Sequence, residues 1–206
     1  MKKHYHIFQL AMAFLFLASY SSTTLSAEHI IIPKFGTIER SENLDHSVDN
    51  NLFDLDDDIV AAAGATYLYK LDNGIAFGAS VFGYENEIIA TANNDGDAIT
   101  GHIYGIVEKY FNTDGVVKPY IGMGLGFAST HFDGSVNGNI DDDYVDTAVG
   151  LSYEIIAGIE IDIQDNIGMI IEYNYFDFEI DDDIDNRDVE IESDGHALFF
   201  GVAIHF

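Results

Sequence analysis

The feature that most constrains the fold is the final stretch of the chain, Gly195 to Phe206, which contains no Asp, Glu, Lys or Arg and ends on an aromatic residue. Read at a period of two, one face carries large apolar side chains and the other mostly small ones, which is the alternation of a strand rather than a helix. The large face holds His196, Leu198, Phe200, Val202, Ile204 and Phe206. A stretch of about a dozen residues also has the length that a tilted strand needs to cross a bilayer.

The same alternation recurs along the rest of the chain, so about eight strands are expected. The seven that precede the final stretch cover residues 30–40, 59–70, 75–86, 99–111, 119–130, 147–162 and 167–180. Long acidic segments (41–57, 87–98, 131–146 and 181–194) alternate with short turns (71–74, 112–115 and 164–166). Asn73-Gly74 predicts a tight hairpin, because such turns need a positive φ. Short turns on one side and long loops on the other are typical of a transmembrane β-barrel.

The first 27 residues are expected to be a secretory signal peptide. Lys2 and Lys3 precede an apolar run from residue 7 to residue 18, and small residues then lead to a cleavage site after Ala27. The apolar run is too short for a membrane anchor, and no other segment reaches the length of a membrane helix. The predicted mature domain, residues 28–206, must therefore cross a membrane as a closed sheet if it crosses one at all.

The charge balance limits what the chain can bind. It has 36 Asp and Glu against 8 Lys and Arg, a formal net charge of -28 at pH 7. Binding of nucleic acid through phosphate neutralisation is therefore excluded. With 48% hydrophobic residues the chain is too apolar to be disordered, so the acids must be segregated from an ordered framework. There is no cysteine, which suits passage through an oxidising compartment.

These features resemble the small outer-membrane β-barrels of the OmpA/OmpX-like kind. Gly201, Ile204 and Phe206 match the terminal insertion signal of that family, although Phe199 stands where a polar residue is usual. The glycine-rich run 118–128 looks like the central strand of such barrels. The resemblance implies an all-β fold, an eight-stranded antiparallel up-and-down transmembrane β-barrel, located in the bacterial outer membrane.

The resemblance also implies a function of a general kind. We expect a non-enzymatic membrane scaffold whose acidic surface loops serve envelope integrity or adhesion and surface interaction, with a small ion-conducting or transport barrel as the alternative. The expected partners are outer-membrane lipid and lipopolysaccharide, the barrel assembly machinery, and divalent cations on the acidic loops. No cofactor and no nucleic acid are expected, the barrel is expected to be a monomer, and no peptidoglycan-binding domain is expected after Phe206.

Seven charged residues fall on the proposed inner face, and we expect them to form a structural charge network. They are Lys34, Arg40, Lys70, Glu108, Glu154, Glu160 and Glu172. The interior of an eight-stranded barrel is just wide enough for side chains to fill, and buried charges must pair or be hydrated. Glu154 or Glu172 is the expected partner of Lys70, and a water-filled ion pathway is the rival interpretation. Acids on this face favour a membrane barrel over a soluble lipocalin-like one, which would turn its apolar face inward.

The remaining histidines and aspartates match no catalytic or metal motif. His46, Ser47 and His131 do not reproduce the arrangement of lipid-deacylating barrels, so no enzyme is expected. The aspartates at 141–143 and 181–183 are consecutive and lack the alternate spacing and central glycine of an EF-type calcium loop. They are expected to be solvated loop surface.

Overall fold

The computed structural model describes residues 27–40, 46–48, 51–52, 54–55, 59–90, 94–111, 114–134, 147–184 and 187–206. The strands are β1 (Ala27–Arg40), β2 (His46–Val48), β3 (Asn51–Leu52), β4 (Asp54–Leu55), β5 (Val60–Leu71), β6 (Ile75–Ala90), β7 (Asn94–Tyr110), β8 (Val117–Gly134), β9 (Thr147–Gln164), β10 (Ile167–Ile184) and β11 (Arg187–His205). Within these described ranges, no helix is long and apolar enough to span a membrane. The predicted signal peptide, up to residue 26, lies outside them.

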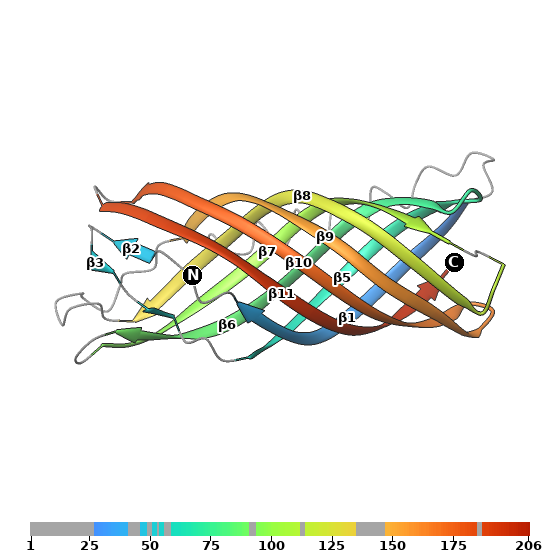
Figure 1. Cartoon of the computed structure of the whole chain (residues 1–206), viewed down its shortest axis with the longest axis horizontal. Helices are drawn as coiled ribbons and strands as arrows, with labels where there is room; N and C mark the ends of the chain where they lie inside the picture. The colour runs from blue at the N-terminus through green and yellow to red at the C-terminus, as the bar shows by residue number, and fades with distance from the viewer. Residues whose placement is uncertain are drawn as a thin grey trace.

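The eight long strands form one closed barrel (Figure 1). Each pairs antiparallel with the next long strand in the chain, and β11 returns to pair with β1 along a seam that runs from Ile30↔His205 to Arg40↔Gly195. Closure gives every long strand two neighbours, so no row of backbone donors and acceptors is left for lipid to face. The predicted eight-stranded antiparallel barrel is confirmed.

The two ends of the barrel differ in the connections that they carry. At the short-turn end, residues 72–74, 111–116 and 165–166 join successive strands, and the start of β1 lies beside the end of β11. Gly74 has a φ of 78° and its N–H donates to the carbonyl of Leu71 at 2.8 Å, which is the predicted Asn-Gly hairpin. The opposite end carries the two long connections, residues 41–59 and 135–146, besides the shorter ones at 91–93 and 185–186, and β2 and β4 pair there with β11 and β6.

Two segments predicted as acidic loops are largely strand. β6 and β7 remain paired as far as Ala90↔Asn94, and β10 and β11 as far as Ile184↔Arg187. Crossing a bilayer needs only about 9–11 residues of a tilted strand, whereas β11 has 19. The ladder can continue past the membrane because its backbone hydrogen bonds do not require apolar side chains, and hydrated acids can flank it. Most of the other two long segments, 41–57 and 131–146, lie outside the described residues.

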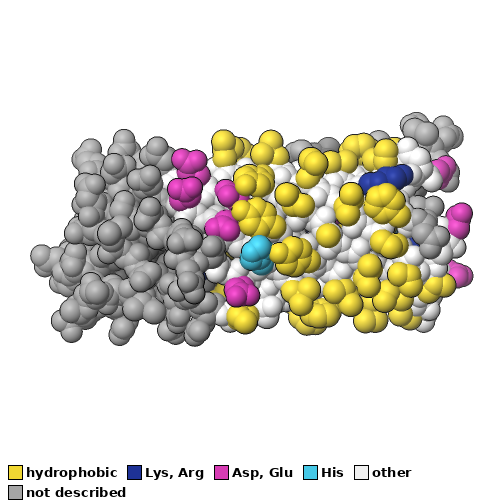
Figure 2. Space-filling view, viewed as in Figure 1, with side chains coloured by type: hydrophobic (Ala, Val, Ile, Leu, Met, Phe, Trp, Pro, Cys, Tyr) yellow, Lys and Arg dark blue, Asp and Glu magenta, His cyan; other side chains and the backbone are white. Residues whose placement is uncertain are grey.

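The alternation of side chains places the apolar face outside. On β8, Ile121, Met123, Leu125 and Phe127 are each more than half exposed, whereas Tyr120 is buried. Figure 2 shows hydrophobic side chains over the middle of the visible face and acidic side chains towards its two ends. A water-soluble barrel would reverse this arrangement, so the lipocalin-like alternative is excluded. The apolar belt is the surface that a transmembrane barrel presents to lipid.

Candidate functional site

The interior of the barrel is the candidate site, and its side chains form three layers of different chemistry. An aromatic layer lies towards the long connections, a polar layer surrounds Lys34, and an ionic cluster lies at the short-turn end. All seven residues predicted for the inner face are buried there, with at most 7% of any of them exposed. Their contribution to stability stays a prediction.

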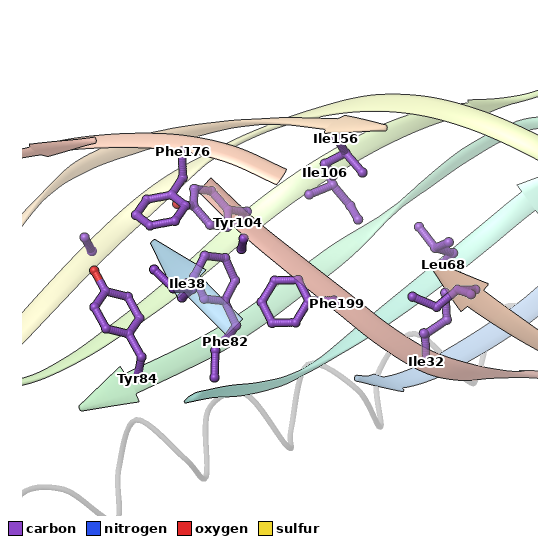
Figure 3. Close-up of a cluster of buried hydrophobic side chains, with 14 of the residues drawn as sticks. Ile32, Ile38, Leu68, Phe82, Tyr84, Tyr104, Ile106, Ile156, Phe176 and Phe199 are labelled. Carbon is purple, nitrogen blue, oxygen red and sulfur yellow. The ribbon is translucent and has the colours of Figure 1, made fainter. Parts of the chain in front are cut away.

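The aromatic layer bridges the full width of the barrel. Phe82 on β6 and Phe176 on β10 come from opposite walls, since three long strands separate them on either side. Their ring centroids are 5.7 Å apart, and Phe82 lies 5.5 Å from the ring of Phe199. Figure 3 shows these rings converging with Tyr104, whose hydroxyl lies 2.6 Å from Ser152 Oγ. Rings that meet across the lumen close it at this level.

The polar residues of the aromatic layer include Arg40 and His102. Arg40 is the last residue of β1 and stands opposite Gly195 in the seam. His102 on β7 stacks on Phe82 with ring centroids 4.6 Å apart, and its Nδ1 lies 2.9 Å from the hydroxyl of Tyr104. The end of the lumen nearest the long connections is therefore filled by packed rings together with buried polar side chains, among them Thr100 and Thr130, whose hydroxyls are 3.1 Å apart.

The polar layer is centred on Lys34. Its Nζ donates to Glu172 Oε1 at 2.7 Å and to Ser80 Oγ at 3.2 Å, and it lies 4.8 Å from the centroid of the Phe199 ring. Tyr120 donates its hydroxyl to the other oxygen of Glu172 at 2.9 Å. One chain of polar contacts thus joins β6, β1, β10 and β8 through the interior, and both oxygens of Glu172 have a donor.

Two further carboxylates are buried beside this chain. Glu108 and Glu154 both interact electrostatically with Lys34 and Glu172, and Glu154 Oε2 accepts from Asn174 Nδ2 at 2.9 Å. Their neighbours on β8 are glycines that leave them room. An added Cβ at Gly122 would lie 2.7 Å from Glu108 Cγ, and one at Gly124 would lie 2.8 Å from Glu154 Cγ. The inward glycines of β8 therefore make space for side chains on the neighbouring strands.

The ionic cluster at the short-turn end, here called the mouth cluster, consists of Glu28, Lys70, Lys118, Glu160, Asp162 and His205. Lys70 Nζ lies 3.0 Å from Glu28 Oε2, and the other oxygen of Glu28 accepts from His205 Nδ1 at 2.7 Å. The second ring nitrogen of His205 lies 3.1 Å from Glu160 Oε1. Lys118 Nζ lies 2.7 Å from Asp162 Oδ2 and 3.5 Å from Glu160 Oε1.

The predicted partner of Lys70 is wrong. Lys70 pairs with Glu28, not with Glu154 or Glu172, because the register of β1 and β5 sets Glu28 directly opposite it. The oxygens of Glu172 are already taken by Lys34 and Tyr120. Glu28 was absent from the predicted set because it adjoins the expected cleavage site.

Sequence reasoning also missed three other members of the mouth cluster: Lys118, Asp162 and His205. Each stands two positions beyond a residue whose inward orientation the alternation already indicates, namely Tyr120, Glu160 and Ala203. Asp162 and His205 lie inside predicted strands, so the alternation already placed them on the inner face, and extending the pattern by one residue at the start of the strand 119–130 would have found Lys118.

The residues of the predicted insertion signal lie at the closing seam. Gly201 points inward, where an added Cβ would lie 2.7 Å from the carbonyl oxygen of Pro33, while Ile204 and Phe206 are exposed on the outside. The backbone N–H of Phe206 donates to the carbonyl of His29 at 3.0 Å, the reverse bond is 3.1 Å, and the two rings stack. Their role in assembly stays a prediction.

The histidine, serine and aspartate residues that match no catalytic or metal motif in the sequence have the following positions. His46 and Ser47 lie in β2 beside β11, and His131 lies on β8 opposite Thr147. Residues 181–183 belong to β10, and residues 141–143 lie outside the described residues. Within the described part of the chain, one group of possible metal ligands comes together, in which donor atoms of Glu160, Asp162 and His205 lie within 4.8 Å of one another.

Solved structures with a similar fold are outer-membrane barrels. Neisserial surface protein A aligns with a TM-score of 0.56 at 15% identity, over 87% of this chain and 97% of that one. The outer membrane protein OprG from Pseudomonas aeruginosa aligns with a TM-score of 0.58 at 14% identity, over 88% and 97%. The outer membrane protein AlkL, solved in DMPC lipid bilayers, aligns with a TM-score of 0.50 at 14% identity, over 90% and 93%. At these identities the likeness concerns the fold alone.

The sequence itself identifies the family. No curated protein matches the chain significantly. The family model described as outer membrane protein beta-barrel domain, however, matches residues 34–206, which include residues 34–40 of β1 and the other seven barrel strands in full. This chain therefore belongs to the outer membrane protein beta-barrel domain family and is a protein of the bacterial outer membrane.

Proposed function

We propose that this chain is a non-enzymatic, monomeric scaffold of the outer membrane whose lumen conducts no ions. Its acidic segments at the long-connection end would then carry its role in envelope integrity or in adhesion and surface interaction. The observation that carries the closed lumen is the contact of Phe82 with Phe176, two rings from opposite walls whose centroids are 5.7 Å apart.

The polar layer supports the same conclusion at a second level. An ion that passes Lys34 must displace its ammonium from Glu172, and that pair is almost fully buried. Separating the partners of a buried ion pair costs several kcal/mol, because each charge keeps its desolvation penalty. Two successive barriers, one of packed rings and one of ion pairs, make a passive structural role the simplest function for the interior.

The outer surface supports a role at the membrane face. Near the long-connection end, β10 and β11 place acids directly opposite one another, at Asp177↔Asp194 and Glu179↔Glu192. Like charges in direct cross-strand register are destabilising unless they are neutralised. We propose that divalent cations neutralise them and bridge them to lipopolysaccharide phosphates, which would tie the barrel to the surrounding lipid.

The closed lumen is tested by current recordings. Refolded full-length protein, shown by protease resistance to be inserted, is added to planar bilayers, and the expected result is no stable opening. The matched variant Phe82→Ala with Phe176→Ala removes both rings and is expected to raise the baseline leak. Stable, ion-selective openings of the unmodified protein would contradict the proposal.

The second candidate is a small ion-conducting barrel, and one observation favours it. Three buried carboxylates, those of Glu108, Glu154 and Glu172, surround the one ammonium of Lys34 in the described part of the polar layer. An interior with an excess of acids attracts cations. Cation-selective openings that are lost in Glu108→Gln with Glu154→Gln would establish this function in place of the scaffold.

A further inference from the structure

Three possible metal ligands converge at the short-turn end of the lumen. Glu160 and Asp162 come from β9 and His205 from β11, and their donor atoms lie within 4.8 Å of one another. One imidazole nitrogen with two carboxylates is a donor set that suits Zn²⁺ and the other divalent first-row metals, whereas Mg²⁺ and Ca²⁺ prefer oxygen alone.

The most buried member of this group, Glu160, has one carboxylate oxygen without a donor. Glu160 is 0% exposed and its Oε2 accepts no hydrogen bond, whereas its Oε1 is in ion-pair contact with His205 and Lys118. His205 Nε2 is also buried without a hydrogen bond, although it lies only 3.1 Å from Glu160 Oε1. Buried polar atoms are normally satisfied, so the unpartnered Oε2 of Glu160, beside a histidine nitrogen and a second carboxylate, leaves a ligand position for a further ion.

The orientation of His205 is the one that a metal ligand needs. Its Nδ1 is bonded to Glu28 Oε1 at 2.7 Å, which fixes the ring and leaves Nε2 directed at Glu160. Metal-binding histidines usually have such a second bond to a carboxylate. Ligands about 2.0–2.2 Å from a tetrahedral ion stand roughly 3.4 Å apart. The 3.1 Å between Nε2 and Glu160 Oε1 is close to this spacing, and a carboxylate oxygen of Asp162 lies within 4.8 Å of both ligands.

A protein cation competes for the same oxygens. Lys118 Nζ lies 2.7 Å from Asp162 Oδ2 and 3.5 Å from Glu160 Oε1, so its ammonium holds the carboxylates in place of a metal. Lys118 stands at the barrel rim, and a long flexible side chain can move its charged end into water. Metal binding would therefore displace Lys118 and leave the rest of the mouth cluster in position.

We propose that Glu160, Asp162 and His205 form a site for one divalent transition-metal ion of the Zn²⁺ class at the short-turn mouth of the barrel. Glu28 orients the histidine, and Lys118 is the competing cation. The bound ion joins β9 to β11 beside the seam where the barrel closes, so it stabilises the closed barrel at the end that carries no long connection.

The site is tested by titrating Zn²⁺ into full-length protein, folded in detergent and carrying no polyhistidine tag, against a chromogenic chelator. The expected result is one ion per chain. His205→Gln and, separately, Asp162→Asn are each expected to weaken binding at least tenfold. Glu28→Gln is expected to weaken it by about 10–100-fold, which is typical when the partner of a metal-bound histidine is lost.

Two variants distinguish this site from weak binding by the many surface acids. Lys118→Met removes the competing ammonium, so affinity for Zn²⁺ is expected to rise. His29→Gln removes a histidine at the same end that lies outside the group, so affinity is expected to stay unchanged. Protease resistance shows which variants are folded. If His205→Gln does not fold, Asp162→Asn, whose side chain lies at the partly exposed rim, tests the site in its place. Equal affinities of the unmodified protein, His205→Gln and Asp162→Asn would overturn the proposal, as would weaker binding by folded Lys118→Met.

Discussion

The ammonium of Lys34 lies 2.7 Å from a carboxylate oxygen of Glu172, although the two residues are 138 positions apart in the chain. Their side chains are only 1% and 2% exposed. The pair reaches from β1 to β10 past the intervening β11, so it fastens the strands on both sides of the closing seam. It is the best-shielded ion pair in the described part of the lumen, and stability should depend on it.

Lys34→Met should lower the free energy of unfolding by about 3–5 kcal/mol, because Glu172 keeps its desolvation penalty without its partner. Urea unfolding, followed by the gel mobility of unheated samples, measures the change. Adding Glu172→Gln should recover part of the loss. Lys109→Met is the control: the ammonium of Lys109 donates to the carbonyl of Asn73 at an exposed turn, so a change within about 0.5 kcal/mol is expected. An equal loss in both single variants would contradict this account.

Lys70→Met should cost less than Lys34→Met. Its partner Glu28 is 39% exposed, so water and salt already screen the pair, and a loss of about 1 kcal/mol is expected. A double-mutant cycle should show coupling of Lys70 with Glu28 and none with Glu172. Coupling with Glu172 instead would mean that the register at this end differs from the one described.

Gly126→Ala should destabilise the barrel even though alanine is small. An added Cβ would lie 1.8 Å from the carbonyl oxygen of Ile103 on β7, so two paired strands must move apart. Overpacking of this kind typically costs about 1–3 kcal/mol. Gly101→Ala is the matched control, since its Cβ would meet nothing within 4 Å. Thermal unfolding of the two variants should separate them, and similar midpoints would contradict the prediction.

Deletion of Phe206 should leave export intact and reduce the folded form in the outer membrane. Two reasons support this: the match of Gly201, Ile204 and Phe206 to a terminal insertion signal, and the backbone bonds of Phe206 with His29. Protease-resistant barrel in outer-membrane fractions measures the effect, and refolding in detergent separates the two reasons. Loss in cells with normal refolding indicates recognition by the assembly machinery, whereas loss in both indicates the missing seam contacts. Normal levels in both experiments would refute the prediction.

The long connections should lie outside the cell and the short turns in the periplasm. Acids crowd the long segments, whereas Lys70, Lys109 and Lys118 lie at the short-turn end. An epitope tag inserted near Asn94 or Asn139 should be labelled on intact cells, and one at Asn73 should be labelled only after the cells are opened. The opposite pattern would invert the orientation.

Alternation was enough to predict the eight long strands and which residues share a face, and the acids and glycines on one face indicated that this face points inward. A run such as Tyr120-Ile121-Gly122-Met123 shows the two faces directly, because successive side chains of a strand point to opposite sides. The strand ends were predicted less well. β10 continues past its predicted end at residue 180 to Ile184, and β11 begins at Arg187, before its predicted start at residue 195. Beyond the bilayer no apolar side is needed, so the sequence there carries no periodic signal even though the backbone ladder continues.

Only the tertiary structure decided which inward residues meet. The sequence places Lys34, Lys70 and Glu172 on the same inner face, but it contains no information on the stagger with which β1 and β11 close the barrel. The register of β1 with β5 sets Glu28 opposite Lys70, and the stagger at the β1–β11 seam, together with the registers of β9 and β10, leaves Lys34 for Glu172 and brings His205 to Glu160. A strand pattern specifies the direction of a side chain, whereas contact across a lumen depends on the register of the closed sheet, which is a property of all eight strands together.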